Sequence, residues 1–320
     1  MPLLSFIIPI YNVEKYINNC LQSIYNQELD KNIFEVIAVN DGTPDNSMEI
    51  VNRYKEKYNN LTVINKANGG VSSARNVGIE RSNGEYIIFV DGDDSIFDNS
   101  IKRILDTIRG IDSIDMLVTC SFTSQLKEER YAWKDKFEEN KKYSLKNLLE
   151  NKYERGSVCG VVFNRLFLIK NNIKFPLNVH NGEDTIFFST CLACLNKLAF
   201  SYIPLYSIYE REGSASRCAY SLNRLEKNIK GLDFLDMFLN KGQYNIYQRD
   251  VIQLCKYRII SNIIYQSNNS NIKYKDFNNR TKINRYLPIK LSTKIYPPIL
   301  LLNCSSYLFY LLSMLKHKVK

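Results

Sequence analysis

Apolar and polar positions follow two alternating periods through the first 95 residues of the chain. Four short apolar runs have the length of buried β-strands, at residues 4–9, 34–39, 61–64 and 86–90. Three stretches with helical spacing or helix-start turns lie between them, at residues 16–24, 47–58 and 72–80. This rhythm predicts an α/β fold with a Rossmann-like, mostly parallel sheet that is flanked by helices.

Polar turns follow three of these predicted strands. They occupy residues 40–45, 68–70 and 91–94. Because ligands of parallel sheets bind beyond the carboxyl ends of the strands, we expect these turns to converge on one cleft.

The remaining chain divides into a mixed region and a helical region. Up to residue 217 the pattern predicts strands at 114–120, 158–163 and 198–209, a loop with a helix at 123–143, and a helix from residue 182. Beyond it, apolar residues recur at helical spacing in 222–232 and 252–263, and Asn- and Lys-rich residues 266–283 indicate a linker. The predicted organisation is a domain at 1–217, with halves at about 1–95 and 96–217, and a helical C-terminal region at 218–320.

Both ends of the sequence bear on where the protein works. The N-terminal apolar run is short, ends at a proline and has no basic leader, which predicts a cytoplasmic, reducing location. Residues 299–315 are apolar but interrupted, and Lys316, Lys318 and Lys320 follow. They suit an interfacial helix attracted to anionic lipid, or equally a helix docked on the protein's own core.

Composition narrows the range of functions. With 45% hydrophobic and 24% charged residues, the chain is expected to be globular. Its net charge of +10 favours polyanionic partners, but no basic stripe with interleaved aromatics is present, which argues against nucleic acid. The eight cysteines are spread along the chain and do not form a disulfide framework. Cys191 and Cys194 are expected to lie on one face of a helix and to pack in the protein core rather than to hold zinc.

Candidate chemistry concentrates in the turns. In Asp91-Gly92-Asp93-Asp94, carboxylates two residues apart can face one cleft and hold a hard cation, Mg²⁺ or Mn²⁺, on a diphosphate; an ordinary turn is the alternative. Asp41 can accept hydrogen bonds from a base or ribose, or simply cap a turn. Arg75 follows a turn into a helix N-terminus, which suits an anion, so this side chain could meet phosphate or fix a neighbouring carboxylate; a surface salt bridge is the alternative.

A second acidic position lies far along the chain. Asp184 stands at the start of the predicted helix from residue 182. A helix start favours an ionised carboxylate, so this residue suits a general base for an acceptor hydroxyl; a helix cap is the alternative.

Five ordered motifs together resemble the family 2 glycosyltransferases of the GT-A fold, over about residues 3–216. They are SFIIPIYN from residue 5, VNDGTPDNS from 39, NGGVSSARNVG from 68, GEYIIFVDGDD from 84 and GEDTIFF from 182. Two positions depart from the family pattern. Asn40 stands where many relatives carry Asp, so the base pocket has one carboxylate fewer, and Pro44 replaces a common Thr.

The resemblance implies a role for each motif residue. Asp184 would be the catalytic base and Asp93 the metal ligand, with Mn²⁺ or Mg²⁺ as cofactor. Donor binding would fall to Pro9, Tyr11, Asp41, Asn68, Gly69, Arg75, Asp91, Gly92 and Arg211. Within that set, Tyr11 would stack on uracil, and Arg211 would meet phosphate from a segment that closes over the diphosphate.

The implied function is that of an inverting hexosyltransferase that moves Glc, Gal, GlcNAc or GalNAc from a UDP-sugar to a hydroxyl. The acceptor would be a glycan or polyprenyl-linked saccharide of cell-surface polysaccharide synthesis, at the inner face of the membrane, with possible peripheral contact to anionic lipid and no nucleic acid. A sugar-phosphate nucleotidyltransferase and a non-catalytic carbohydrate-binding protein on the same scaffold are the alternatives. A dehydrogenase is disfavoured because no G-x-G-x-x-G follows the first strand.

Overall fold

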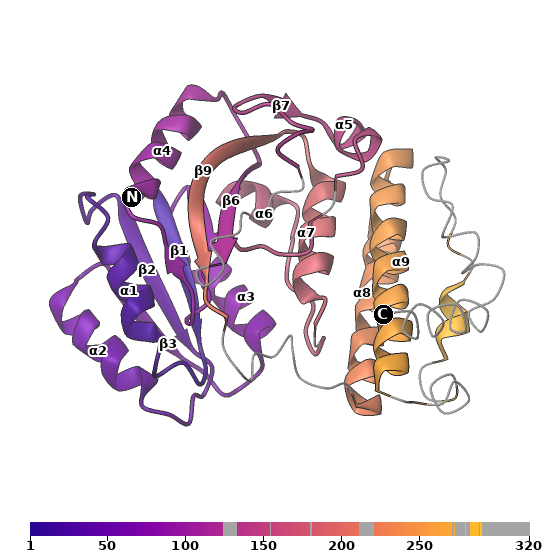
Figure 1. The fold of residues 1–320 in the computed structure, drawn as a ribbon, viewed down its shortest axis with the longest axis horizontal. Helices are drawn as coiled ribbons and strands as arrows, with labels where there is room; N and C mark the ends of the chain where they lie inside the picture. The colour runs from indigo at the N-terminus through magenta and orange to yellow at the C-terminus, as the bar shows by residue number, and fades with distance from the viewer. Residues whose placement is uncertain are drawn as a thin grey trace. The chain divides into compact units, whose positions relative to one another are not determined.

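A computed structural model describes residues 1–123, 133–153, 155–179, 181–210, 221–270, 272, 279, 282–287 and 289. The chain forms two compact units. Unit 1 consists of residues 1–153, 157–177 and 195–212, and unit 2 of residues 154–156, 178–194 and 213–320. Each unit is described by itself below (Figure 1).

Unit 1 is built on a sheet of nine strands, in the spatial order β3-β2-β1-β4-β8-β6-β9-β5 with β7 beside β9. The strands are β1 (Leu4–Ile10), β2 (Phe34–Asn40), β3 (Leu61–Asn65), β4 (Tyr86–Phe89), β5 (Ser95–Ile96), β6 (Met116–Thr123), β7 (Lys142–Tyr143), β8 (Val161–Asn164) and β9 (Leu198–Ile208). Strands β1 to β4 are mutually parallel, as is β6 with β9, whereas β8 runs antiparallel to β4 and β6. The α/β prediction with a mostly parallel sheet is confirmed.

Helices cover both faces of this sheet. They are α1 (Ile17–Tyr25), α2 (Ser47–Lys57), α3 (Val71–Arg81), α4 (Ser100–Gly110), α5 (Leu145–Glu150) and α6 (Arg165–Lys170). Because side chains alternate along a strand, Phe6 and Ile8 share one face, where they join a core that includes residues of α1, α2 and α4. On the opposite face Gly78 of α3 lies against Ile7, so close that a Cβ would lie 2.2 Å from an Ile7 methyl carbon.

Unit 2 is helical in its described part, with α7 (Glu183–Cys194), α8 (Leu222–Lys241), α9 (Ile246–Asn269) and the 3₁₀ turn η1 (Ile283–Tyr286). Helices α8 and α9 pack against each other and against α7. Gly231 allows the close approach of α8 to α7, since a Cβ there would lie 2.5 Å from Ile186 Cδ1. The predicted helical spacing is confirmed, because all but one of the residues that define it on both helices are buried: Leu225, Ile229, Leu232, Ile252, Cys255, Ile259 and Ile263, whereas Leu222 is partly exposed.

Several predicted boundaries are wrong. The linker expected at 266–283 does not begin at residue 266, because α9 continues to Asn269 and Ile264 and Ser267 are buried; most of the residues expected to form the linker lie outside the described set. Strand β8 starts at Val161 rather than 158, since the chain turns at Gly160, whose φ is +70°. For the loop with a helix expected at 123–143, residues 124–132 lie outside the described set, so the helix stays a prediction there, and the described residues 133–143 form turns and β7.

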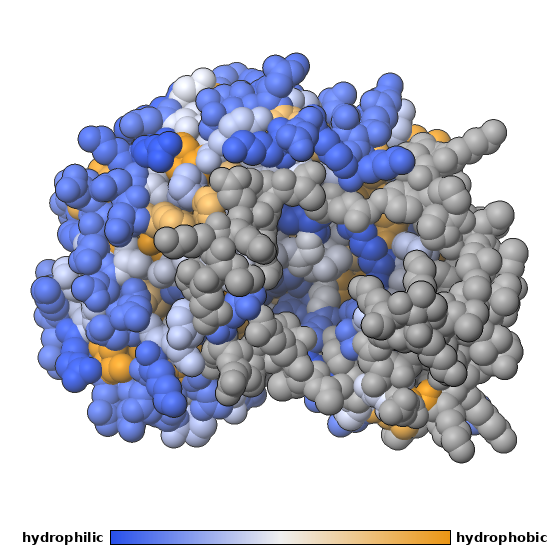
Figure 2. All heavy atoms as spheres, viewed as in Figure 1, coloured by the Kyte–Doolittle hydropathy of each residue, from blue (hydrophilic) through white to orange (hydrophobic). Residues whose placement is uncertain are grey.

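Other expectations fall on residues outside the described set. These include the interfacial helix at 299–315 and Arg211. Among the described residues, no helix combines the length and the apolar character that crossing a membrane requires. On the face shown in Figure 2, hydrophilic residues dominate the described surface of unit 1 and apolar ones occur in small groups.

Candidate active site

The acidic turn after β4 lies where the carboxyl ends of β1, β2 and β4 meet. Asp94 N–H donates to the Asp91 carbonyl over 2.9 Å, which closes the turn. Arg75, only 3% exposed, donates to Asp91 Oδ1 over 2.7 Å, and its guanidinium lies 5.1 Å from the centre of the Phe175 ring. The predicted anion-binding arginine therefore fixes a carboxylate of the acidic turn, and Asp91 is held before any ligand arrives.

Asp94 faces inward from the same turn. Its carboxyl accepts from the Tyr206 hydroxyl and from Tyr209 N–H, both over 2.8 Å. Burial and, to a lesser extent, the charges of Asp91 and Asp93 raise the pKa of Asp94 to about 8, against the lowering effect of these two hydrogen bonds. Burial also raises the pKa of Tyr206 well above its ordinary value, so its hydroxyl stays protonated, donating to Asp94 while it accepts from Asp91 N–H over 2.9 Å.

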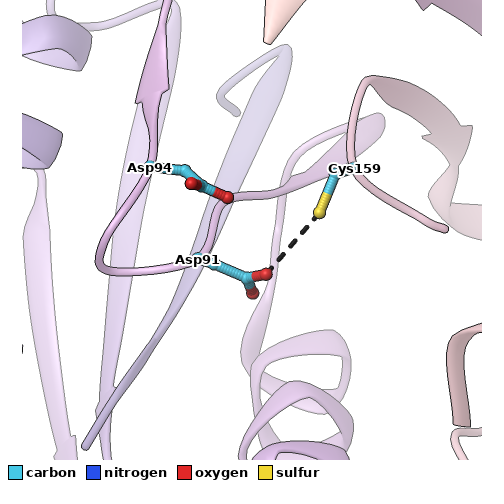
Figure 3. Close-up of side chains that lie close together, drawn as sticks. All are labelled: Asp91, Asp94 and Cys159. Carbon is cyan, nitrogen blue, oxygen red and sulfur yellow. Dashed lines mark hydrogen bonds between the residues drawn. The ribbon is translucent and has the colours of Figure 1, made fainter. Parts of the chain in front are cut away.

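A cysteine completes this cluster. Oxygens of Asp91 and Asp94 and the Cys159 sulfur lie within 4.8 Å of one another (Figure 3), and the thiol donates to Asp91 Oδ2 over 3.6 Å. Mg²⁺ and Mn²⁺ prefer oxygen ligands, so the Cys159 sulfur does not suit them. The half-buried carboxylates of Asp91 and Asp93 do fit a hard divalent cation, with Asp94 and Cys159 as supports.

Asp41 braces a second turn beside the first. It is 2% exposed, forms an ion pair with Lys66, and accepts from Gly69 N–H over 2.9 Å and from Gly70 N–H over 2.8 Å. Its two oxygens thus tie the Asn68-Gly69-Gly70 turn to the end of β2. This brings the predicted donor-binding residues Asp41, Asn68 and Gly69 together, while their contact with a base stays a prediction.

The end of β1 adds an exposed aromatic ring. Pro9 pairs with Val39 inside the sheet, and Tyr11, directly after the strand, is 44% exposed. Gly92 permits the close packing here, because a Cβ would lie 3.0 Å from Val13 Cγ2 and 3.3 Å from the Pro9 carbonyl oxygen. An exposed tyrosine at this position suits stacking on a planar base, which stays a prediction.

Asp184 belongs to unit 2, in the first turn of α7. The helix begins after Gly182, whose φ is +125° and whose carbonyl accepts from Ile186 N–H over 2.9 Å. Asp184 is half-buried at this helix start. Its meeting with Asp93 of unit 1 stays a prediction.

Sequence reasoning missed three contributors to the site. Lys66, Cys159 and Tyr206 come from the ends or approaches of β3, β8 and β9, and none lies in a motif. Only Lys66 carried a signal, since it stands two residues before the Asn68 turn.

The profile of the family described as Glycosyl transferase family 2 matches residues 5–171. The chain is 32% identical to the uncharacterized glycosyltransferase EpsJ of Bacillus subtilis, over 69% of this chain and 64% of EpsJ. It is equally identical to a poly(ribitol-phosphate) beta-glucosyltransferase of Bacillus spizizenii, over 68% of this chain and 34% of that protein. It thus spans less than two thirds of either relative.

A solved structure is similar over almost the whole chain. Staphylococcus aureus TarS 1-349 in complex with UDP-GlcNAc superposes with a TM-score of 0.78 at 22% identity, covering 99% of this chain and 92% of that one. At this identity the likeness establishes the GT-A fold.

Proposed function

This chain belongs to glycosyl transferase family 2, and we propose that it is an inverting, metal-dependent glycosyltransferase with a UDP-sugar as donor. The observation that carries the proposal is the braced acidic turn after β4. Arg75 and Cys159 fix Asp91 from two sides, while Asp93 stays half-buried on the same turn. Preorganised oxygen donors at the strand ends suit a metal–diphosphate group.

The proposed reaction is a single displacement. Asp184 accepts the proton of an acceptor hydroxyl, and the oxygen attacks the anomeric carbon as the bond to the diphosphate breaks and UDP leaves with both electrons. An α-linked donor therefore yields a β-linked product. Asp93 and Asp91 would hold the divalent cation, which when bound neutralises charge on the diphosphate oxygens.

Donor and acceptor follow from similarity together with the site. The structural relative carries UDP-GlcNAc, which supports GlcNAc as the first candidate among Glc, Gal, GlcNAc and GalNAc. The second sequence relative is named for a poly(ribitol-phosphate) acceptor, which supports a role in cell-surface polymer synthesis. We place the enzyme at the cytoplasmic face of the membrane, with a glycan or polyprenyl-linked saccharide as acceptor and peripheral contact to anionic lipid.

A donor screen tests this proposal. The protein is incubated with UDP-GlcNAc, UDP-Glc, UDP-Gal and UDP-GalNAc plus Mn²⁺, and UDP release is followed without acceptor. We expect slow hydrolysis of one donor, lost in Asp93→Asn and kept in the matched control Asp98→Asn, whose carboxylate is exposed four residues after Asp94. Hydrolysis of none of these donors, or equal rates in both variants, would contradict the proposal, and pyrophosphate release from UTP plus a sugar 1-phosphate would indicate a nucleotidyltransferase.

A further inference from the structure

Unit 2 contains a cavity of about 330 Å³ that the reaction above does not use. Nine of the described residues of this unit line it, from the chain before β8, the start of α7, and helices α8 and α9: Arg155, Gly156, Asn181, Gly182, Thr185, Asn228, Arg258, Ile259 and Asn262. The cavity is large enough for a phosphate together with several carbon atoms, and it opens beside the turn that carries Asp184.

The charge of the lining is one-sided. Arg155 and Arg258 line it from different segments, and no carboxylate is among the described residues that line it. Gly182 and Thr185 add the N-terminus of the twelve-residue helix α7, where backbone N–H groups have no partner within the helix. Arginine forks and a helix N-terminus together favour a phosphate over a neutral ligand.

Asn228 is the second, independent observation. It is 1% exposed, lines the cavity, and neither its Nδ2 nor its Oδ1 has a hydrogen-bond partner in the described structure. A buried amide without partners is costly, so a residue of this kind at a core-facing position of α8 points to a ligand. A phosphate could accept from Nδ2 but could not donate to Oδ1, whereas a hydroxyl group can do both.

Hydrogen bonds connect the segments that form the walls of the cavity. Thr185 Oγ1 donates to the Gly156 carbonyl over 3.3 Å, and the Thr185 carbonyl accepts from Cys255 Sγ of α9 over 3.7 Å. Thr185 directly follows Asp184 in the first turn of α7. A ligand in the cavity would therefore be held beside the proposed base by the same helix start.

We propose that this cavity is an acceptor subsite for a hydroxylated phosphate unit, either a polyol phosphate or a sugar phosphate. Arg155, Arg258 and the α7 N-terminus bind the phosphate, and Asn228 binds a hydroxyl on the carbon next to it. A neighbouring hydroxyl of the same acceptor then reaches Asp184. The acceptor role rests on the proposed glycosyl transfer, while binding of the phosphate unit is independent of it.

Calorimetric titration of the full-length protein with glycerol 3-phosphate, inorganic phosphate and glycerol tests the cavity. We expect affinity in the order glycerol 3-phosphate, phosphate, glycerol, with about a tenfold step between the first and the last. Arg258→Gln and Arg155→Gln should each weaken glycerol 3-phosphate binding about tenfold. The matched control Arg249→Gln removes the same charge from an exposed position of α9 and should leave the affinity unchanged.

Asn228→Leu separates the two parts of the site. It should keep phosphate binding and abolish the preference for glycerol 3-phosphate over phosphate, whereas Asn223→Leu, at an exposed position of the same helix, should keep both. No binding of any probe, equal affinity of the arginine variants and the wild type, or an unchanged preference in Asn228→Leu would each overturn the subsite.

Titration with UDP and Mn²⁺ distinguishes failure of the inference from failure of the proposed function. UDP binding without glycerol 3-phosphate binding overturns the subsite alone. Glycerol 3-phosphate binding without UDP binding supports the anion site and overturns the donor site.

Competition then identifies the source of the phosphate. A soluble glycerol-phosphate oligomer and a detergent-solubilised prenyl-diphosphate saccharide are each tested against glycerol 3-phosphate. Competition by either supports the subsite and names its acceptor class, and competition by neither overturns the acceptor role.

Discussion

The acidic turn of unit 1 and the cavity of unit 2 are both polar sites, but they differ in how their buried polar groups are satisfied. At the turn, the carboxylates of Asp94 and Asp41 and Nη2 of Arg75 have protein partners at hydrogen-bond distance. In the cavity, both amide atoms of the buried Asn228 lack one.

The difference separates two kinds of preorganisation. A site whose groups hold each other is rigid without ligand and suits a metal–diphosphate group that every donor shares. A site that leaves a buried amide unsatisfied loses stability until a ligand arrives, which suits selection of an acceptor. The comparison predicts that the partnered buried groups of the turn, such as Asp41, contribute to folding and that Asn228 contributes to binding.

The largest expected effect belongs to Asp184, the proposed general base for the acceptor hydroxyl. Asp184→Asn removes the proton acceptor but keeps the side-chain shape, so kcat should fall about 10³-fold. Affinity for UDP, measured by titration with Mn²⁺, should stay within about twofold because the donor groups lie in unit 1. The exposed Asp112→Asn is the control. Loss of UDP binding in Asp184→Asn would instead assign Asp184 to the donor site.

Asp93 should show the opposite pattern. Asp93→Asn removes one charged oxygen ligand, so Mn²⁺-dependent UDP affinity and kcat/KM should both fall about 10²-fold. Chelation of the metal by EDTA should abolish wild-type activity, and addition of Mn²⁺ should restore it. Retention of full Mn²⁺ dependence in the variant would assign the metal to other ligands.

Asp41 tests the contribution of polar groups to folding in unit 1. Asp41→Ala leaves Lys66 and the Gly69 and Gly70 N–H groups without their acceptor, so the free energy of unfolding should fall by about 3 kcal/mol. Urea denaturation measures the change. Asp106→Ala, at an exposed position of α4, should cost no more than about 0.5 kcal/mol. Similar costs at the two positions would remove the bracing role of Asp41.

The smallest effect should come from Asn228, where the comparison predicts no loss. Asn228→Leu replaces an unsatisfied buried amide with an apolar side chain next to a cavity that gives it room, so the free energy of unfolding should stay within about 1 kcal/mol or rise. The same urea assay applies. A loss as large as that of Asp41→Ala would show that Asn228 is a structural residue.

The sequence predicted the parallel half of unit 1 well, because each buried strand there is a short apolar run with a turn signal behind it. Strands β1 to β4 begin within a residue of the expected positions. It did not predict β5 or the place of β8 between β4 and β6, since antiparallel insertion depends on long-range pairing that no local pattern records. The acidic turn was also predicted correctly, because it directly follows one of these apolar runs.

Supports from distant strands could not be predicted. Tyr206 contacts Asp91 and Asp94 from more than 110 residues away, and a tyrosine in an apolar run indicates only a buried strand. The role of Asn228 could not be predicted from the sequence either, since it lies between the apolar positions Leu225 and Ile229 that predicted α8. Its meaning depends on the absence of a partner, which only the fold can show.

Crystallography of the protein with UDP-GlcNAc and Mn²⁺, using the anomalous signal of manganese, tests the central claim most directly. The account predicts a single manganese peak bonded to an Asp93 oxygen and to the diphosphate, with the Asp184 carboxylate facing the anomeric carbon on the side opposite UDP. A manganese peak away from Asp93, or Asp184 on a surface that the donor does not reach, would contradict it.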